Sequence, residues 1–369
     1  MSFRLRAGQQ EAIVVVEGRI ADPDTAADLD VDLGAGVVMP GLINAHDHLH
    51  RNHYPRLGSP PYPDVYAWGE DLHSRFASDI DRAKTLPRDR ALLFGALKNL
   101  VGGVTTVVHH DGWEPLFEEA FPIRVVQLRV AHTLRLEDDL ERAFRPHGNT
   151  VGQPACIHLA EGRGREMAAE VRALERMGWV NDELLAVHLV GVDDGGIELL
   201  RKHNAAVVWC PTSNAFLYGA TAPAKLFAPG IDVLLGTDAL LTGEGTLLHE
   251  LRAARKLRFL DDDRLRAAVG HVAAQRLRIP IPSLAPGSRA DLLFVRRPLF
   301  DALPADVALV ITEGVPQLGD EIFAGLFDAC GVAVEPLVVG GTRKLAAAPL
   351  GSVARQVMQL TPECRRIFA

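Results

Sequence analysis

The stretch VVMPGLINAHDHLH, residues 37 to 50, decides how the rest of this chain is interpreted. Its apolar run is interrupted once by a Pro-Gly pair and stops at the sequence HDH. Residues two apart on a strand point to the same face, so His46 and His48 project together from the end of a buried strand. Neutral imidazole is the commonest protein ligand for metals. The spacing therefore suggests a catalytic divalent metal; the alternative is a solvated, histidine-rich loop that also contains His50 and His53.

The composition is that of an α/β protein with a sizeable core. The chain has 369 residues, of which 48% are apolar and 23% charged, a length that suits an α/β barrel with an appended domain. A net charge of −8 argues against a nucleic-acid partner, and no apolar run is long enough to span a membrane. The N-terminus lacks a signal-peptide core, and the four cysteines show no paired spacing. These features predict a soluble cytoplasmic protein without a membrane partner.

The strand patterns at the two ends of the chain resemble each other. Short segments with alternating apolar and polar residues, typical of antiparallel sheets with one wet face, occur near both termini. Between them, strand-like and helix-like segments alternate, which predicts parallel βαβ units. The predicted domains are a small β domain of residues 1–39 and 285–345, a (β/α)8 TIM barrel of residues 40–284, and a helical tail of residues 346–369.

The section between Thr106 and His158 is short for a barrel of this kind. The strand-like segment IRVVQLRVAHT supplies a third barrel strand, but no convincing fourth strand follows it. Two alternatives stay open: either the fourth strand is missing, or the stretch RPHGNTVGQP forms a minimal substitute for it.

Titratable side chains end several of the predicted parallel strands, where the active site of a barrel lies. These strand-end residues are His46, His48, His158, His188 and Asp238. Three imidazoles and a carboxylate, with water as a further ligand, leave an exchangeable position on zinc or iron(II). The metal would lower the pKa of its water towards 7. Glu161, three residues after His158, and His188 are available to move protons between that water and a leaving nitrogen.

With these residues in place, the chain resembles the amidohydrolase superfamily. The resemblance is to the branch that contains cytosine, guanine and adenosine-type deaminases, together with triazine and S-adenosylhomocysteine hydrolase-deaminases. The matching stretches, in the order of the family, are PGLINAHDHLH, GGVTTVV, IHLAEG, LLAVHLVGVDDGGIELL, VVWCPTSN, VLLGTD and LAPGSRADLLFV. They extend from Pro40 to about Val295. The resemblance implies a TIM barrel beside a split β-sandwich, and hydrolysis of a carbon–nitrogen bond outside peptides.

The resemblance also implies a role for each strand-end residue. The implied ligands of one divalent metal, Zn²⁺ or Fe²⁺, are His46, His48, His158 and Asp238. Glu161 would be the proton shuttle, His188 would steer or polarise the attacking hydroxide, and Asp238 would also accept the proton of the water. Binuclear relatives use a carboxylated lysine at the end of the fourth strand, and no lysine ends a strand in this part of the chain. We therefore expect one metal, with Asp47 in a structural role and His50 and His53 outside the ligand set.

Two segments depart from the pattern of these relatives. The compressed section around the missing fourth strand normally supplies substrate contacts, so the substrate stays open. The segment LLTGEGTLLHEL after Asp238 also differs from the asparagine-bearing version that is common in deaminases.

Other side chains near the predicted strand ends are candidate substrate contacts. They are His109, His110, His132 and Trp68. The first two end one strand, so one of them should point into the site. His132 ends the next strand, and Trp68 lies in a loop expected above the barrel mouth. For each of them the alternative is a purely structural role.

The leading functional hypothesis is deamination of a heterocyclic amine, with a small-molecule amine or amide as substrate. Hydrolytic ring opening of a lactam or cyclic imide and dehalogenation of a triazine-like ring would use the same residues. A non-enzymatic relative that acts as a binding or scaffold protein is the remaining hypothesis; the complete set of ligands argues against it. The oligomeric state stays open, with a homodimer as a candidate.

Overall fold

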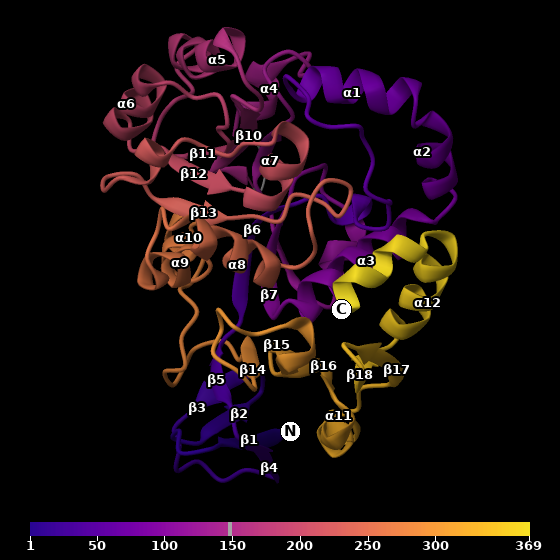
Figure 1. The fold of residues 1–369 in the computed structure, drawn as a ribbon. Coiled ribbons are helices and arrows are strands. Elements are labelled where there is room, and N and C mark those ends of the chain that lie inside the picture. The colour runs from indigo at the N-terminus through magenta and orange to yellow at the C-terminus, as the bar shows by residue number, and fades with distance from the viewer. Residues whose placement is uncertain (147–149) are drawn as a thin grey trace.

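The computed structural model describes residues 1–146 and 150–369. Parallel strands covered by helices form the larger part of the molecule, and the strands of the two chain ends lie together below them in Figure 1. The predicted α/β class is confirmed by this arrangement.

Two mixed or antiparallel sheets contain the strands of the chain ends, in the orders β3-β2-β1-β4 and β17-β18-β16-β15-β14-β5. Their bounds are β1 (Ser2–Ala7), β2 (Ile13–Val16), β3 (Arg19–Ala21), β4 (Leu29–Gly34), β5 (Val37–Pro40), β14 (Leu292–Val295), β15 (Val307–Thr312), β16 (Val315–Asp320), β17 (Val334–Val339) and β18 (Thr342–Ala347). β5 pairs with β14, so segments from both ends share one sheet. Apolar side chains of both sheets, among them Phe3, Leu292 and Leu309, form one core.

Two parallel sheets contain the strand-end residues singled out in the sequence, in the orders β6-β7-β8 and β13-β12-β11-β10-β9. Their bounds are β6 (Leu42–Asp47), β7 (Val104–His109), β8 (Arg124–Val126), β9 (Arg129–Ala131), β10 (Ala155–Leu159), β11 (Leu184–His188), β12 (Ala206–Trp209) and β13 (Val233–Leu235). Most of these strands are buried throughout, as expected for parallel strands with covered faces.

The two parallel sheets meet beside the histidines of β6. The His48 N–H donates to the carbonyl oxygen of Asp238 at 2.7 Å, and the Asp238 N–H donates to the His46 carbonyl at 3.1 Å. An isolated parallel bridge joins Asp47 to Asp238. These bonds fix the end of β13 against the end of β6 and bring the first and last parallel strands together.

The region between β7 and β10 contains less chain than two complete strands need. β8 pairs with β7, β9 pairs with β10, and only Gln127 and Leu128 separate β8 from β9. One continuous run therefore supplies a strand to each sheet. The described residues of RPHGNTVGQP contain no strand, and residues 147–149 of that stretch lie outside the described residues. In chain order β9 is therefore the fourth parallel strand of the described chain; it comes from the same run as β8 and not from RPHGNTVGQP, so neither of the two alternatives describes it.

Helices flank the strands, with bounds α1 (Val65–Ser74), α2 (Ala77–Ala83), α3 (Arg88–Val101), α4 (Leu140–Phe144), α5 (Arg165–Arg176), α6 (Asp194–Lys202), α7 (Pro211–Tyr218), α8 (Leu247–Leu257), α9 (Asp262–Ala268), α10 (His271–Arg276), α11 (Ala324–Ala329) and α12 (Leu350–Leu360). Side-chain caps start several of them; the Asp193 carboxylate, for example, accepts the Gly196 N–H at the start of α6. Among the described residues, none of the helices has the length and apolar character that crossing a membrane requires.

Candidate active site

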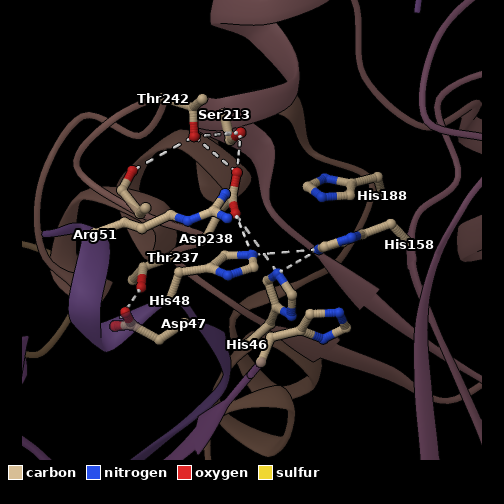
Figure 2. A network of polar contacts seen from close by, with 12 residues as sticks. His46, Asp47, His48, Arg51, His158, His188, Ser213, Thr237, Asp238 and Thr242 are labelled. Carbon is tan, nitrogen blue, oxygen red and sulfur yellow. Dashed lines mark hydrogen bonds and ion pairs between the residues drawn. The ribbon is translucent and has the colours of Figure 1, made fainter. Parts of the chain in front are cut away.

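Four side chains from three strand ends converge on one point, as Figure 2 shows. His46 belongs to β6, His48 follows it directly, His158 belongs to β10, and Asp238 follows β13. The Nε2 atom of His158 lies 3.2 Å from Nε2 of His46 and 3.4 Å from Nε2 of His48. Oδ1 of Asp238 lies 3.6 Å from Nε2 of His46 and 3.4 Å from Nε2 of His48. We call these four residues the donor cluster.

The separations within the donor cluster fit a bound divalent metal. Tetrahedral zinc with ligand bonds near 2.0–2.1 Å places its ligand atoms about 3.3 Å apart. Burial lowers the pKa of His46, His48 and His158, which keeps their imidazoles neutral, the form that binds a metal. His188 also offers a nitrogen to this region, since its donor atom and those of His46, His158 and Asp238 lie within 4.8 Å of one another.

Asp238 is held in place by its backbone and by two hydroxyl groups. Ser213 Oγ donates to Oδ2 of Asp238 at 2.6 Å, and Thr242 Oγ1 does so at 2.7 Å (Figure 2). The remaining oxygen, Oδ1, faces the imidazoles. Burial raises the pKa of Asp238, but the hydrogen bond and charge of His46, with His188 and Ser213, hold that pKa well below its usual range. Asp238 has a left-handed φ of 59°, a strained conformation that often occurs at functional sites.

Glu161 and His188 form a second pair beside the donor cluster. Nε2 of His188 lies 3.6 Å from Oε1 of Glu161, and the Tyr218 hydroxyl donates to the same oxygen at 2.8 Å. Burial raises the pKa of Glu161 to about 7, so this carboxyl can hold and release a proton near neutrality. Nδ1 of His188 lies 2.8 Å from the amide oxygen of Asn214, which can only accept. Nδ1 therefore holds the proton, and the lone pair of Nε2 faces the site.

Asp47 points away from the donor cluster into a buried polar network. Its Oδ2 accepts from Lys98 Nζ at 2.8 Å and from Asn99 Nδ2 at 2.8 Å, and its Oδ1 accepts from Asn52 Nδ2 at 2.7 Å. The side chains of both Asp47 and Lys98 are 0% exposed. The network agrees with the structural role predicted for Asp47, because it fixes the turn between the two metal-facing histidines.

The paired histidines that end β7 point in different directions. The His110 ring lies 4.7 Å from that of His46 and 4.2 Å from that of His158, and its Nε2 donates to the Ala131 carbonyl at 3.1 Å. His109 instead accepts the Leu49 N–H at Nδ1. His110 thus lies beside the donor cluster and makes the structural hydrogen bond that was the alternative, and its contact with a substrate stays a prediction.

The other candidate contacts lie close to the donor cluster or outside it. Trp68 and His132 line the small space above the cluster. His50 lies 3.4 Å from Asp111, and His53 bonds the Ala83 carbonyl, so neither reaches the donor cluster.

Several supporting residues were not assigned a site role from the sequence. Ser213 bonds Asp238, and Asn214 bonds His188. Their position after β12 was a usable signal, because strand ends face the site. Tyr218 and Thr242 carried no such signal, since their contacts depend on where α7 and the loop after Asp238 run in space.

Comparisons with known proteins fit this geometry. No family model matches the chain. A 5'-deoxyadenosine deaminase of Methanosarcina mazei is 26% identical over 305 aligned positions, which cover 66% of this chain and 68% of that protein. A 5-methylthioadenosine/S-adenosylhomocysteine deaminase of Symbiobacterium thermophilum is 25% identical over 386 aligned positions, which cover 82% of this chain and 86% of that protein.

Solved structures share the fold over nearly the whole chain. An adenosine deaminase from Xanthomonas campestris with bound zinc has a TM-score of 0.73 at 17% identity and covers 98% of both chains. Atrazine chlorohydrolase TrzN from Arthrobacter aurescens TC1, complexed with zinc, has a TM-score of 0.70 at 16% identity, with 98% of this chain and 100% of that chain covered.

The fold, the relatives and the donor cluster together define a hydrolase with a site for a divalent metal. The chain is thus similar to deaminases in sequence and to an adenosine deaminase and a triazine hydrolase in fold, which supports the resemblance to this branch of the amidohydrolase superfamily seen in the sequence.

Proposed function

We propose that this chain is a metal-dependent aminohydrolase that deaminates a heterocyclic amine. The observation that carries this proposal is the donor cluster beside Glu161. The candidate ligand atoms of the cluster lie 3.2 to 3.6 Å apart, and the pKa of the Glu161 carboxyl is raised to about 7. The proposed metal ligands are His46, His48, His158 and Asp238. When bound, the metal would lower the pKa of a water to about 7 and supply hydroxide at neutral pH.

Glu161 and Asp238 would move the protons. Glu161 donates a proton to the ring nitrogen next to the carbon under attack, which makes that carbon more electrophilic. Asp238 accepts one proton of the attacking water and passes it to the amino group, which leaves as ammonia. The proton of the added hydroxyl group returns to Glu161 as the carbonyl forms. The ring nitrogen keeps the proton it received, so the protons balance.

His188 would position the attacking water. Its Nε2 lone pair faces the site because Asn214 fixes the proton on Nδ1. A nitrogen acceptor in this place can take a hydrogen bond from the water and orient its oxygen. His188 also has a left-handed φ of 73°, which turns the end of β11 towards Glu161.

We propose zinc as the metal, supported by the zinc in two solved neighbours. Three imidazoles and one carboxylate suit zinc and iron(II) alike, so metal analysis of the purified protein has to decide between them.

We further propose the finer architecture. The two parallel sheets would form one barrel in which residues 124–131 serve both neighbours, and the two remaining sheets would form a β-sandwich of residues 1–39 and 285–345. The shared core of the two chain ends supports the second part. A cytoplasmic location is supported by four free cysteines, of which three are buried.

The direct test is ammonia release by the zinc-loaded protein. The panel is 5'-deoxyadenosine, 5'-methylthioadenosine, S-adenosylhomocysteine, atrazine and a cyclic imide, the first three chosen from the names of the relatives. We expect ammonia from at least one adenosine derivative. Chloride from atrazine without ammonia from any compound would indicate dehalogenation, and opening of the imide alone would indicate a ring-opening hydrolase.

A further inference from the structure

The space directly above the donor cluster is too small for a heterocyclic substrate. It measures about 20 Å³ and is closed by side chains that include Val65 and Trp68 of α1. A space needs roughly 10–15 Å³ to hold one water, so this one has room for about one water molecule. A heterocycle does not fit into this space as the structure has it, so the larger space next to it is the candidate for the substrate.

A much larger cavity lies beside the site, at the junction of β8 and β9. It measures about 610 Å³, within the range of roughly 300–1,000 Å³ typical of ligand sites. It is lined by the end of β7, by residues 125–130 and by part of α4. β7 pairs with β8 only as far as Val108, and the bond from His110 to the Ala131 carbonyl spans the gap beyond that point. We call this space the lateral cavity.

His132 connects the two spaces. It lines both the lateral cavity and the small space above the donor cluster, and its ring lies 5.1 Å from that of His158. Nδ1 of His132 is buried and has no hydrogen-bond partner among the described residues. His132 is thus the side chain that the two spaces share.

The walls of the lateral cavity favour an aromatic, non-anionic ligand. Trp113 and Phe117 place their rings 5.3 Å apart in one wall. The acidic residues in the lining are Asp111, Glu137, Asp138 and Asp139, and the basic ones are Arg129 and Arg142.

The charge balance in this lining stays acidic when ion pairs with residues outside it are set aside: Asp111 pairs with Arg88 and Arg129 with Glu183, which leaves three carboxylates and one arginine. Arg129 donates to the carbonyl oxygens of Phe144 and Gln153 and pairs with Glu183. In the β7 wall, the Nδ1 atom of His109 accepts a backbone N–H, so its buried and unpartnered Nε2 is a proton donor. The cavity thus offers aromatic faces, an excess of carboxylates and the N–H of His109 as a donor, and a phosphate would meet net repulsion.

We propose that the lateral cavity receives the substrate, a heterocyclic amine whose substituent is neutral or cationic, such as an unphosphorylated nucleoside. Its reacting carbon would reach the donor cluster past His132. This inference rests on the proposed deaminase function for the reacting end of the molecule. The separation of β8 and β9 into two sheets thereby becomes the feature that makes room for the ligand.

The test fills the cavity from two walls. Gly112 lies in the lining, and a Cβ added there meets no atom within 4 Å. Gly112→Trp therefore adds a large side chain whose Cβ does not clash. Ala143→Trp fills the cavity from α4. Gly325→Trp in α11 is the matched control, because a Cβ at Gly325 also meets no atom within 4 Å. Bound zinc and calorimetric affinity for 5'-deoxyadenosine and adenosine 5'-monophosphate are measured for each protein.

We expect wild type and Gly325→Trp to bind 5'-deoxyadenosine and to bind the monophosphate much more weakly. Both cavity variants should keep zinc and lose roughly tenfold or more in affinity for 5'-deoxyadenosine, because the added ring occupies its space. Unchanged affinity in both cavity variants, no binding by wild type, or equal affinity for the monophosphate would overturn the inference. Loss of binding in the variants without ammonia release by wild type would instead refute the proposed function and leave the cavity assignment standing.

Discussion

The hydroxyl of Tyr218 donates a 2.8 Å hydrogen bond to Oε1 of Glu161, which joins the last turn of α7 to the carboxyl beside the donor cluster. Burial is the main cause that raises the pKa of Glu161 to about 7, and this hydrogen bond acts in the opposite direction. We therefore propose Tyr218 as a positioning residue that lowers the pKa of the Glu161 carboxyl.

Tyr218→Phe should shift the pH dependence of deamination upwards. If Glu161 must be protonated to act, kcat/KM falls as the pH rises through its pKa. Loss of a donor that stabilises the carboxylate raises that pKa, so the high-pH limb should move to higher pH while bound zinc stays unchanged. The measurement is kcat/KM between pH 5 and 9 for both proteins. If the high-pH fall of kcat/KM occurs at the same pH in both proteins, ionisation of Glu161 does not cause that fall.

Glu161→Gln should separate metal binding from chemistry. The amide keeps the size of the side chain and can still accept from Tyr218, but it cannot donate and regain a proton. We expect full zinc content and a loss of turnover of roughly 10²- to 10⁴-fold. Turnover close to wild type would rule out Glu161 as the proton shuttle even if the metal site is correct.

Asp238→Ala should lose zinc and activity together, because it removes one of the four donors. Ser213→Ala is the matched control: it removes one hydroxyl from Oδ2 of Asp238, while Thr242 still donates to that oxygen at 2.7 Å. Metal content per chain after dialysis is the readout. Retention of zinc by Asp238→Ala would mean that His188, whose nitrogen also lies near the cluster, completes the site.

Glu250 should make the stability of the fold depend on pH. Burial raises its pKa to about 8, although the backbone and hydroxyl of Thr212 both donate to its carboxyl group. Between the model-peptide pKa of 4.5 and about 8, the folded protein keeps a proton that the unfolded chain has released, so stability falls as the pH rises.

Glu250→Gln can keep both contacts to Thr212 and removes this ionisation. The free energy of unfolding, measured with denaturant at several pH values, should decrease less between pH 5 and 8 in the variant than in wild type. If the free energy of unfolding changes with pH equally in the two proteins, Glu250 does not cause the pH dependence of stability.

The buried pair of Lys98 and Asp47 should be costly to break. Lys98→Met leaves an uncompensated carboxylate and should destabilise the fold by about 3–5 kcal/mol. Adding Asp47→Asn removes the unpaired carboxylate, so the double variant should regain part of the lost free energy of unfolding, as measured with denaturant. A double variant that is less stable than Lys98→Met would contradict this explanation.

The donor residues could be predicted from the sequence because their signal is local. His46 and His48 follow the period of two of a strand, and His158 ends another buried strand. The pairing of β5 with β14 could be expected from matching strand patterns at the two chain ends. Each of these signals lies within one segment and needs no knowledge of its neighbours.

The supporting contacts could not be predicted in the same way. Tyr218 reaches Glu161 only because of the direction in which α7 leaves β12. The division of residues 124–131 between two sheets was also hidden, because one apolar run looks the same whether it pairs on one side or on both. The lateral cavity follows from that division and left no pattern of its own.

The most direct test of the proposed function is a zinc titration of the metal-free protein, with ammonia release from 5'-deoxyadenosine as the readout. We predict no release without metal, a rate that rises in proportion to bound zinc, and saturation at about one zinc per chain. Saturation with zinc without ammonia from any adenosine derivative, or ammonia release that does not depend on zinc, would contradict it.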